Sequence, residues 1–171
     1  MNNYNEDLKN LAQDLISLAK NREISIVTCE SCTGGLISSL ITSISGASEI
    51  FNYGLVTYSN TSKMNLLNIH EDIIKNNGAV SKAVVELMAK NSILNDSTSN
   101  LSIAVTGIAG PNSDNSKKEV GLVYISSFFK KNNNLISKKF NFKGDRDQIR
   151  NYSALEAIKI LINQLRNHEI R

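Results

Sequence analysis

The stretch from Ile24 to Gly35, ISIVTCESCTGG, decides the fold. Its first five residues are mostly apolar, which predicts a short buried strand over 24–28. The residues that follow are polar and end in two glycines, which is typical of a turn. Apolar residues then resume and predict a helix over 36–44. The stretch therefore predicts a strand, a turn and a helix, with Ser31 in the turn.

The rest of the chain continues this alternation of helices and strands. Helices are predicted over 8–20, 59–67, 81–94 and from Asp145 toward His168, and strands over 50–58, 101–105, 120–129 and 135–142. Residues 130–134 join the last two strands as a hairpin. We expect one α/β domain over 1–171. Its three α/β/α layers would hold a mixed, mostly parallel sheet with one C-terminal hairpin.

Composition narrows the class of protein. The 171 residues are 41% hydrophobic and 20% charged, which is typical of a globular domain. No apolar run approaches the roughly 18 residues of a membrane span, and the polar, acidic N-terminus does not resemble an export signal. We therefore expect a cytoplasmic protein without membrane contact. The net charge of +3 comes without a dense basic stripe, so no nucleic-acid partner is expected.

Three polar or glycine-rich loops follow predicted strands, at 29–35, 58–63 and 106–111. Ligands of open α/β sheets gather at the carboxyl ends of the strands. These three loops are therefore expected to converge on one site.

Ser31 and Lys63 are the residues in these loops with the clearest chemical potential. A serine beside glycines and a helix N-terminus suits a nucleophile next to an oxyanion hole, and it equally suits an anion-binding turn or a helix cap. A nucleophilic serine needs a base. Neither His70 nor His168 has the surroundings of a His triad, whereas a desolvated Lys63 would have a lowered pKa and could accept the proton.

Short motifs over most of the chain occur in the order of a known family. They are 30–35 (ESCTGG), 46–48 (GAS) with Phe51, 54–60 (GLVTYSN) with Lys63, 78–81 (GAVS), 106–111 (TGIAGP), 120–121 (VG) and 144–146 (GDR). Together they resemble CinA C-terminal domains, the nicotinamide-nucleotide amidases, over roughly residues 8–165. Each motif alone is weak evidence, but their shared order is specific.

The resemblance implies hydrolysis of the carboxamide of nicotinamide mononucleotide to nicotinate mononucleotide and ammonia, in pyridine-nucleotide salvage, without cofactor or metal. It implies Ser31 as nucleophile, Lys63 as base and Tyr58 as an assisting hydroxyl. The residues implied in substrate binding are Thr33, Gly34, Gly35, Thr106, Gly107 and Arg146, the arginine as a partner for phosphate or for pocket architecture. The expected partner is a small-molecule nucleotide. The sequence does not decide between a monomer and a homo-oligomer.

The chain also departs from the family. Full-length CinA proteins carry a further N-terminal domain, so this chain is expected to be the stand-alone form. Cys29 replaces a small residue, Asn112-Ser113-Asp114 replaces a glycine-rich stretch, and Glu119 stands where proline is common. The last two departures concern loop geometry and substrate preference more than the core chemistry.

Two other classes of function compete with the amidase. Cys29 and Cys32 form a C-x-x-C at a strand-to-helix junction, as in thiol redox proteins. That site needs a facing cis-proline, and the only proline, Pro111, lies in a loop that the amidase interpretation already explains. A zinc site is disfavoured by the spacing of cysteines and histidines. A non-catalytic nucleotide-binding module is the second alternative, although no Walker A or G-x-G-x-x-G pattern occurs.

Overall fold

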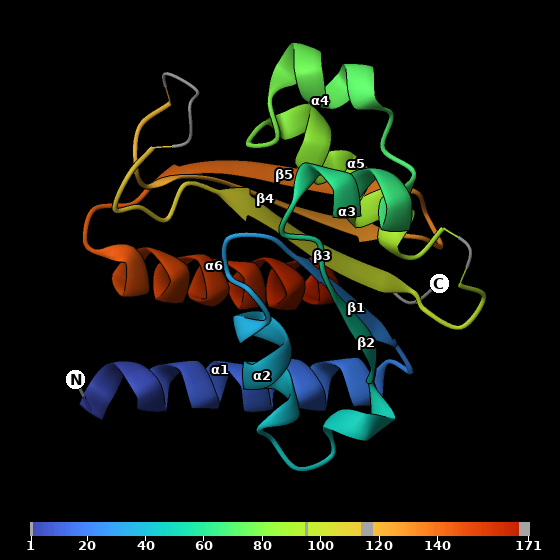
Figure 1. Ribbon diagram of the computed structural model, residues 1–171. Coiled ribbons are helices and arrows are strands. Elements are labelled where there is room, and N and C mark those ends of the chain that lie inside the picture. Colours follow the sequence, from blue (N-terminus) through green and yellow to red (C-terminus); the bar gives the residue numbers. More distant parts are fainter. Residues whose placement is uncertain (1, 95, 114–117, 168–171) are drawn as a thin grey trace.

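A computed structural model describes residues 2–94, 96–113 and 118–167 (Figure 1). The elements are α1 (Asn2–Asn21), β1 (Ile26–Glu30), α2 (Leu36–Thr42), the 3-10 turn η1 (Ala47–Glu49), β2 (Phe51–Val56), α3 (Asn60–Leu67), α4 (Glu71–Asn77), α5 (Lys82–Ser92), β3 (Leu101–Gly107), β4 (Leu122–Phe129), β5 (Asn134–Asn141) and α6 (Arg146–Arg166). The predicted alternation of helices and strands is confirmed.

The five strands form one mixed sheet in the order β2-β1-β3-β4-β5. β2, β1 and β3 are parallel neighbours, whereas β4 pairs antiparallel with both β3 and β5. Only β4 runs against the others, so the prediction of a mostly parallel sheet with a C-terminal hairpin is confirmed. Glu30 pairs with both Val56 and Val105, so the parallel strands end at one edge of the sheet.

Helices cover both faces of the sheet, as predicted for a three-layer domain. In Figure 1, α1, α2 and α6 lie below the sheet and α3, α4 and α5 lie above it. The strands supply both cores by alternation, because successive side chains of a strand point to opposite faces. In β1, Ile26 packs in the core between the sheet and α1, α2 and α6. Val27 packs in the core on the opposite face, between the sheet and α3, α4 and α5.

Side-chain caps explain where three of the helices begin. Ser59 accepts a hydrogen bond from the Ser62 amide at the start of α3, and Ser81 accepts one from Val84 at the start of α5. Asp145 begins α6 with a reciprocal capping box to Gln148. Such caps satisfy amide groups that have no acceptor within the helix.

Several boundaries and one helix differ from the sequence-based expectation. α1 begins at Asn2 rather than at residue 8, and β1 runs over 26–30 rather than 24–28. β1 extends past residue 28 because Cys29 and Glu30 are fully buried in the sheet and continue its ladder. α4 was not predicted, since only Ile73 and Ile74 interrupt its polar sequence.

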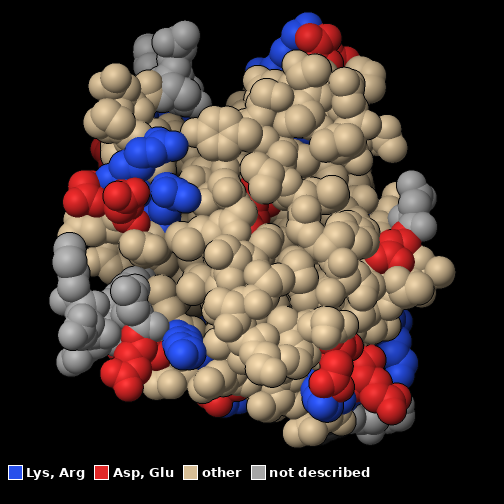
Figure 2. All heavy atoms as spheres, turned by 60° about the horizontal axis from the view of Figure 1, so that its bottom comes forward, with Lys and Arg blue, Asp and Glu red and all other residues tan. Residues whose placement is uncertain are grey.

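One face of the molecule carries few charges. α2 and β2 lie at the front and lower side of Figure 1, the side that is turned to the viewer in Figure 2. Charged side chains gather mainly toward the edges of this view. The sequence explains the pattern, because Glu49 is the only charged residue from 32 to 62. Among the described helices, none is long and apolar enough to cross a membrane.

Candidate active site

The three loops predicted to converge form one wall each of a pocket of about 480 Å³. The pocket lies at the carboxyl ends of β1, β2 and β3, where the strand register brings the loops together. α4 and the turn after it close the remaining side. The lining residues are Ser31, Cys32, Tyr58, Asn60, Lys63, Ile74, Lys75, Gly78, Ala79, Val80, Thr106, Gly107, Ala109 and Arg146.

Ser31 is the first residue after β1 and is 8% exposed. Its amide donates to the Val105 carbonyl at 3.0 Å, so the adjacent strand β3 holds its backbone. Its carbonyl accepts from the Gly34 amide at 3.0 Å and closes a tight turn. Gly34 and Gly35 have φ values of +61° and +96°, which other residues adopt only with strain. The glycine pair therefore lets the chain turn sharply between Ser31 and α2.

Lys63 lies in α3 and is almost completely buried, with 1% of its surface exposed. Its Nζ atom lies 3.2 Å from Ser31 Oγ. The same nitrogen donates to the Thr57 carbonyl at 2.7 Å and to the Tyr58 carbonyl at 3.3 Å. α3 begins directly after the β2 loop that supplies these two carbonyls. The loop and the helix together aim the lysine at the serine.

Burial lowers the pKa of Lys63 from its ordinary value, because the ammonium loses its water. Negative charge on Cys29 or Cys32 would oppose this shift. Both thiols are themselves buried, and desolvation raises the pKa of each to about 12. At neutral pH they are uncharged, so burial alone sets the direction of the lysine's pKa.

The same raised pKa values argue against thiol redox chemistry, because a thiolate is the reactive species. Cys29 and Cys32 are both free, and the Cys29 sulfur lies 3.6 Å from Thr57 Oγ1. The Gly110–Pro111 peptide bond is cis. The two cysteines of the C-x-x-C sequence are thus buried and protonated.

Slow alkylation of the two cysteines is the expected result at pH 8. With pKa values of about 12, roughly one thiol in 10⁴ is ionised at that pH. Iodoacetamide should therefore modify neither cysteine of the folded protein within minutes and both after unfolding in guanidinium chloride, as read by peptide mass spectrometry. Rapid modification of the folded protein would favour the thiol redox alternative.

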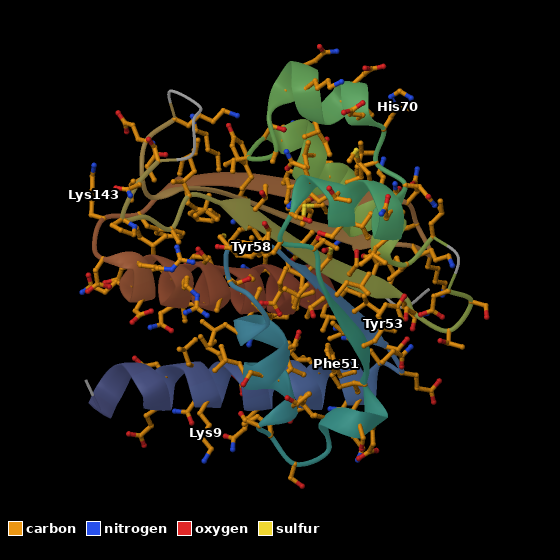
Figure 3. All side chains as sticks on the ribbon, viewed as in Figure 1. Lys9, Phe51, Tyr53, Tyr58, His70 and Lys143 are labelled. Carbon is orange, nitrogen blue, oxygen red and sulfur yellow. The ribbon has the colours of Figure 1, made fainter. Side chains whose placement is uncertain are left out.

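Tyr58, labelled in Figure 3, lines the pocket from the loop after β2. It is 58% exposed. Its hydroxyl accepts a hydrogen bond of 3.1 Å from Arg146 Nη2, while Arg146 Nη1 donates to the Gly110 carbonyl at 2.6 Å. The Tyr58 atom that contacts Lys63 is the backbone carbonyl. Arg146 thus links the loop after β2 with the loop after β3, from the first turn of α6.

Thr106 and Gly107 line the pocket at the end of β3. The Thr106 hydroxyl donates to the Ala79 carbonyl at 3.0 Å and ties β3 to the turn between α4 and α5. Lys118 supports the same turn by donating to the carbonyls of Asn77 and Val80. Sequence reasoning missed this wall because it missed α4. The acidic pair after His70 was the available signal for that helix.

Thr33, Gly34 and Gly35 do not line the pocket. The Thr33 side chain is fully buried, and its carbonyl accepts from Arg150 Nη2 at 3.0 Å. The amide of Gly34 donates to Ser31, and the amide of Gly35 donates to the carboxylate of Glu30 at 2.9 Å. The two glycines shape the turn, and their amides already have acceptors within the protein.

The histidines lie outside this arrangement. His70 caps the start of α4 with its Nδ1 atom and points outward, well away from Tyr58 in Figure 3. His168 falls outside the described residues. Within the described ranges, no three His, Cys, Asp or Glu side chains gather in a way that could hold a metal ion. Of the candidate bases within the described ranges, only Lys63 lies beside Ser31.

Comparison with known proteins agrees with this architecture. A model of the CinA C-terminal domain family matches residues 8–165. A "CinA-like protein" of Prochlorococcus marinus (strain MIT 9215) is 46% identical over 165 residues, which are 95% of this chain and 38% of that protein. A "Putative competence-damage inducible protein" of Caldicellulosiruptor bescii is 40% identical over 158 residues, again 38% of its length. The chain thus spans about two fifths of these curated relatives.

Solved structures share the fold. The competence/damage inducible protein CihA from Agrobacterium tumefaciens superposes with a TM-score of 0.89 at 33% identity, covering 94% of this chain and 96% of that one. A competence damage-inducible protein A from Klebsiella pneumoniae has a TM-score of 0.90 at 24% identity over 95% of this chain and 99% of its own, which shows the fold alone. The family match and these relatives together show that the chain belongs to the CinA C-terminal domain family.

Proposed function

We propose that this chain hydrolyses the carboxamide of nicotinamide mononucleotide, producing nicotinate mononucleotide and ammonia by a Ser/Lys mechanism. The observation that carries the proposal is the 3.2 Å distance between Ser31 Oγ and Lys63 Nζ, with the lysine 1% exposed. A serine nucleophile requires an adjacent base, and a lysine acts as a base only where its pKa is lowered. Burial lowers the pKa of Lys63.

The hydrogen bonds of Lys63 support this role. A neutral amine has two N–H donors and one lone pair. The Thr57 and Tyr58 carbonyls can accept from both N–H groups, which leaves the lone pair for the third neighbour, Ser31 Oγ. In the ammonium form, the third N–H donates to Ser31 instead. Deprotonated Lys63 is therefore oriented to accept the serine proton.

The reaction follows in two steps. Ser31 Oγ attacks the carboxamide carbon, Lys63 takes the serine proton, and the same proton passes to the departing ammonia as the C–N bond breaks. Water then attacks the acyl-serine and gives a proton to Lys63. The ester C–O bond breaks as Lys63 returns this proton to Ser31 Oγ, and the product leaves as the carboxylate. The amides of Gly34 and Gly35 have internal acceptors. We therefore assign the oxyanion to the amide of Cys32, the residue that follows Ser31 and lines the pocket.

The pocket also supports a nucleotide substrate. Its volume of about 480 Å³ falls in the range of sites for small ligands. Lys75 and Arg146 line it, and each can bind a phosphate through a charge-assisted hydrogen bond. α2 cannot serve this purpose, because Glu30 already occupies its N-terminal amides. We therefore assign Lys75 and Arg146 as the hydrogen-bond donors to the substrate phosphate.

Ammonia release tests the proposed function. Purified protein should release ammonia from nicotinamide mononucleotide, with much lower rates on nicotinamide riboside, which lacks the phosphate, and on nicotinamide, which lacks ribose and phosphate. A chelator should leave the rate unchanged, because neither proposed step uses a metal ion. Equal rates on all three amides, or no ammonia from any, would contradict the proposal, as would loss on chelation that zinc restores.

Arg146→Met should selectively reduce the preference for the phosphorylated substrate. One charge-assisted hydrogen bond contributes about 1.5–3 kcal/mol, so KM for nicotinamide mononucleotide should rise by roughly 10- to 100-fold. Activity on nicotinamide riboside should change far less. Tyr58→Phe is the matched control, since it removes only the hydroxyl that Arg146 contacts. Equal losses on both substrates would place Arg146 in pocket architecture rather than phosphate binding.

A further inference from the structure

Glu30 has a buried carboxylate that the proposed reaction does not use. It is the last residue of β1, directly before Ser31, and its side chain is 0% exposed. Its Oε2 atom accepts from the amides of Gly35 and Ile37 at 2.9 and 3.1 Å. Its Oε1 atom accepts from the amide and hydroxyl of Ser38 at 2.9 and 2.7 Å. Four donors thus satisfy a carboxylate, which has about four acceptor sites.

These contacts connect the two ends of the turn that carries Ser31. The carboxylate belongs to the residue before Ser31, and the Gly35 amide belongs to the residue that ends the turn. Between these points, Gly34 and Gly35 both adopt positive φ values. Glycine has more backbone freedom than any other residue, so a turn built on two glycines needs an external restraint to hold one shape. The Glu30 carboxylate provides this restraint from the protein interior.

We propose that Glu30 is a positioning residue for Ser31. Its carboxylate fixes the turn so that Ser31 Oγ stays 3.2 Å from Lys63 Nζ. This inference rests on the proposed Ser/Lys function. A displacement of about 1 Å can reduce a reaction rate by about 100-fold, which gives the restraint a measurable effect.

Two substitutions separate positioning from simple support of the fold. Glu30→Ala removes all four contacts and should lower kcat by about 100-fold with KM changed by less than about threefold. Glu30→Gln should lose only about tenfold, because its amide oxygen can still accept from Gly35 and Ile37 while its amide nitrogen donates to the Ser38 hydroxyl. Ser102→Ala is the matched control. It removes a buried hydrogen bond to the Ala89 carbonyl at the opposite end of the sheet.

The measurement combines kinetics, thermal unfolding and the rate at which a fluorophosphonate probe labels Ser31. We expect Ser102→Ala to lower Tm without changing kcat or labelling, and both Glu30 variants to slow labelling in proportion to kcat. Wild-type rates in a folded Glu30→Ala variant would overturn the inference. If that variant does not fold, a Glu30→Gln variant with wild-type labelling and kcat would overturn it equally.

Failure of the proposed function gives a different result. A wild-type protein that releases no ammonia, yet shows Ser31 labelling that depends on Glu30, would disprove the amidase proposal and keep the positioning role. A wild-type protein whose Ser31 does not react with the probe would overturn the positioning role itself, because a positioned and activated serine is what Glu30 is inferred to maintain.

Discussion

Ser31→Ala is expected to lower kcat/KM for nicotinamide mononucleotide by at least about 1000-fold, because the hydroxyl forms the acyl intermediate. The fold should persist. The substitution removes the hydrogen bond between Ser31 Oγ and Lys63 Nζ, but the backbone hydrogen bonds that shape the turn remain. The measurement is ammonia release at saturating and limiting substrate, together with circular dichroism to confirm the fold. Residual turnover above a few per cent would show that Ser31 is not the nucleophile.

Cys32→Ala is the control for this experiment. Cys32 is the adjacent residue, it lines the same pocket, and its thiol is a second candidate nucleophile. The alanine variant keeps the backbone amide assigned to the oxyanion, so it should retain at least about a tenth of the activity. A larger loss of activity in Cys32→Ala than in Ser31→Ala would show that the Cys32 thiol is the nucleophile.

Lys63→Arg is expected to be nearly inactive although it keeps the positive charge, because arginine does not deprotonate at the pH of catalysis. In the wild type, kcat/KM should rise with pH as Lys63 loses its proton, and the apparent pKa should lie below the ordinary lysine value of about 10.4. Substantial activity in Lys63→Arg would mean that the residue acts only by its charge and is not the base.

The free energy of unfolding should also depend on the titration of Lys63. Burial lowers the pKa of Lys63 in the folded state, so the unfolded chain binds the proton more tightly between the folded and unfolded pKa values. The free energy of unfolding should therefore rise with pH across this window and stay lower below it. Lys63→Met should remove this increment, as measured by urea unfolding of both proteins between about pH 7 and pH 10. An identical pH dependence in both proteins would contradict the lowered pKa.

The sequence predicted the arrangement of strands and loops because local signals determine it. Residues 24–35 combine an apolar run with a glycine pair, which specifies a strand followed by a turn. Parallel strands place their carboxyl ends at one edge, so the loops at 29–35, 58–63 and 106–111 had to meet there. The expected family also agreed with the comparison, which matches residues 8–165.

The finer geometry depended on contacts between distant residues, which sequence spacing does not encode. Tyr58 directs its hydroxyl to Arg146, 88 residues further along the chain, so only its carbonyl contacts Lys63. Glu30 carries no local sign that its carboxylate will accept the amides of α2. The Gly35 amide, expected to face the substrate, therefore donates to Glu30, and the Gly34 amide donates to the Ser31 carbonyl.

The titration of Lys63 itself tests the Ser/Lys assignment most directly. In protein labelled with ¹³C-lysine, the Lys63 Cε resonance can be assigned by its absence from Lys63→Arg and followed from about pH 6 to pH 11. The assignment predicts that this resonance titrates below the ordinary lysine value of about 10.4, at the same pH at which kcat/KM of the wild type reaches half its plateau. A Lys63 resonance that titrates at or above 10.4 would contradict it, because the amine would then be charged whenever Ser31 has to give up its proton.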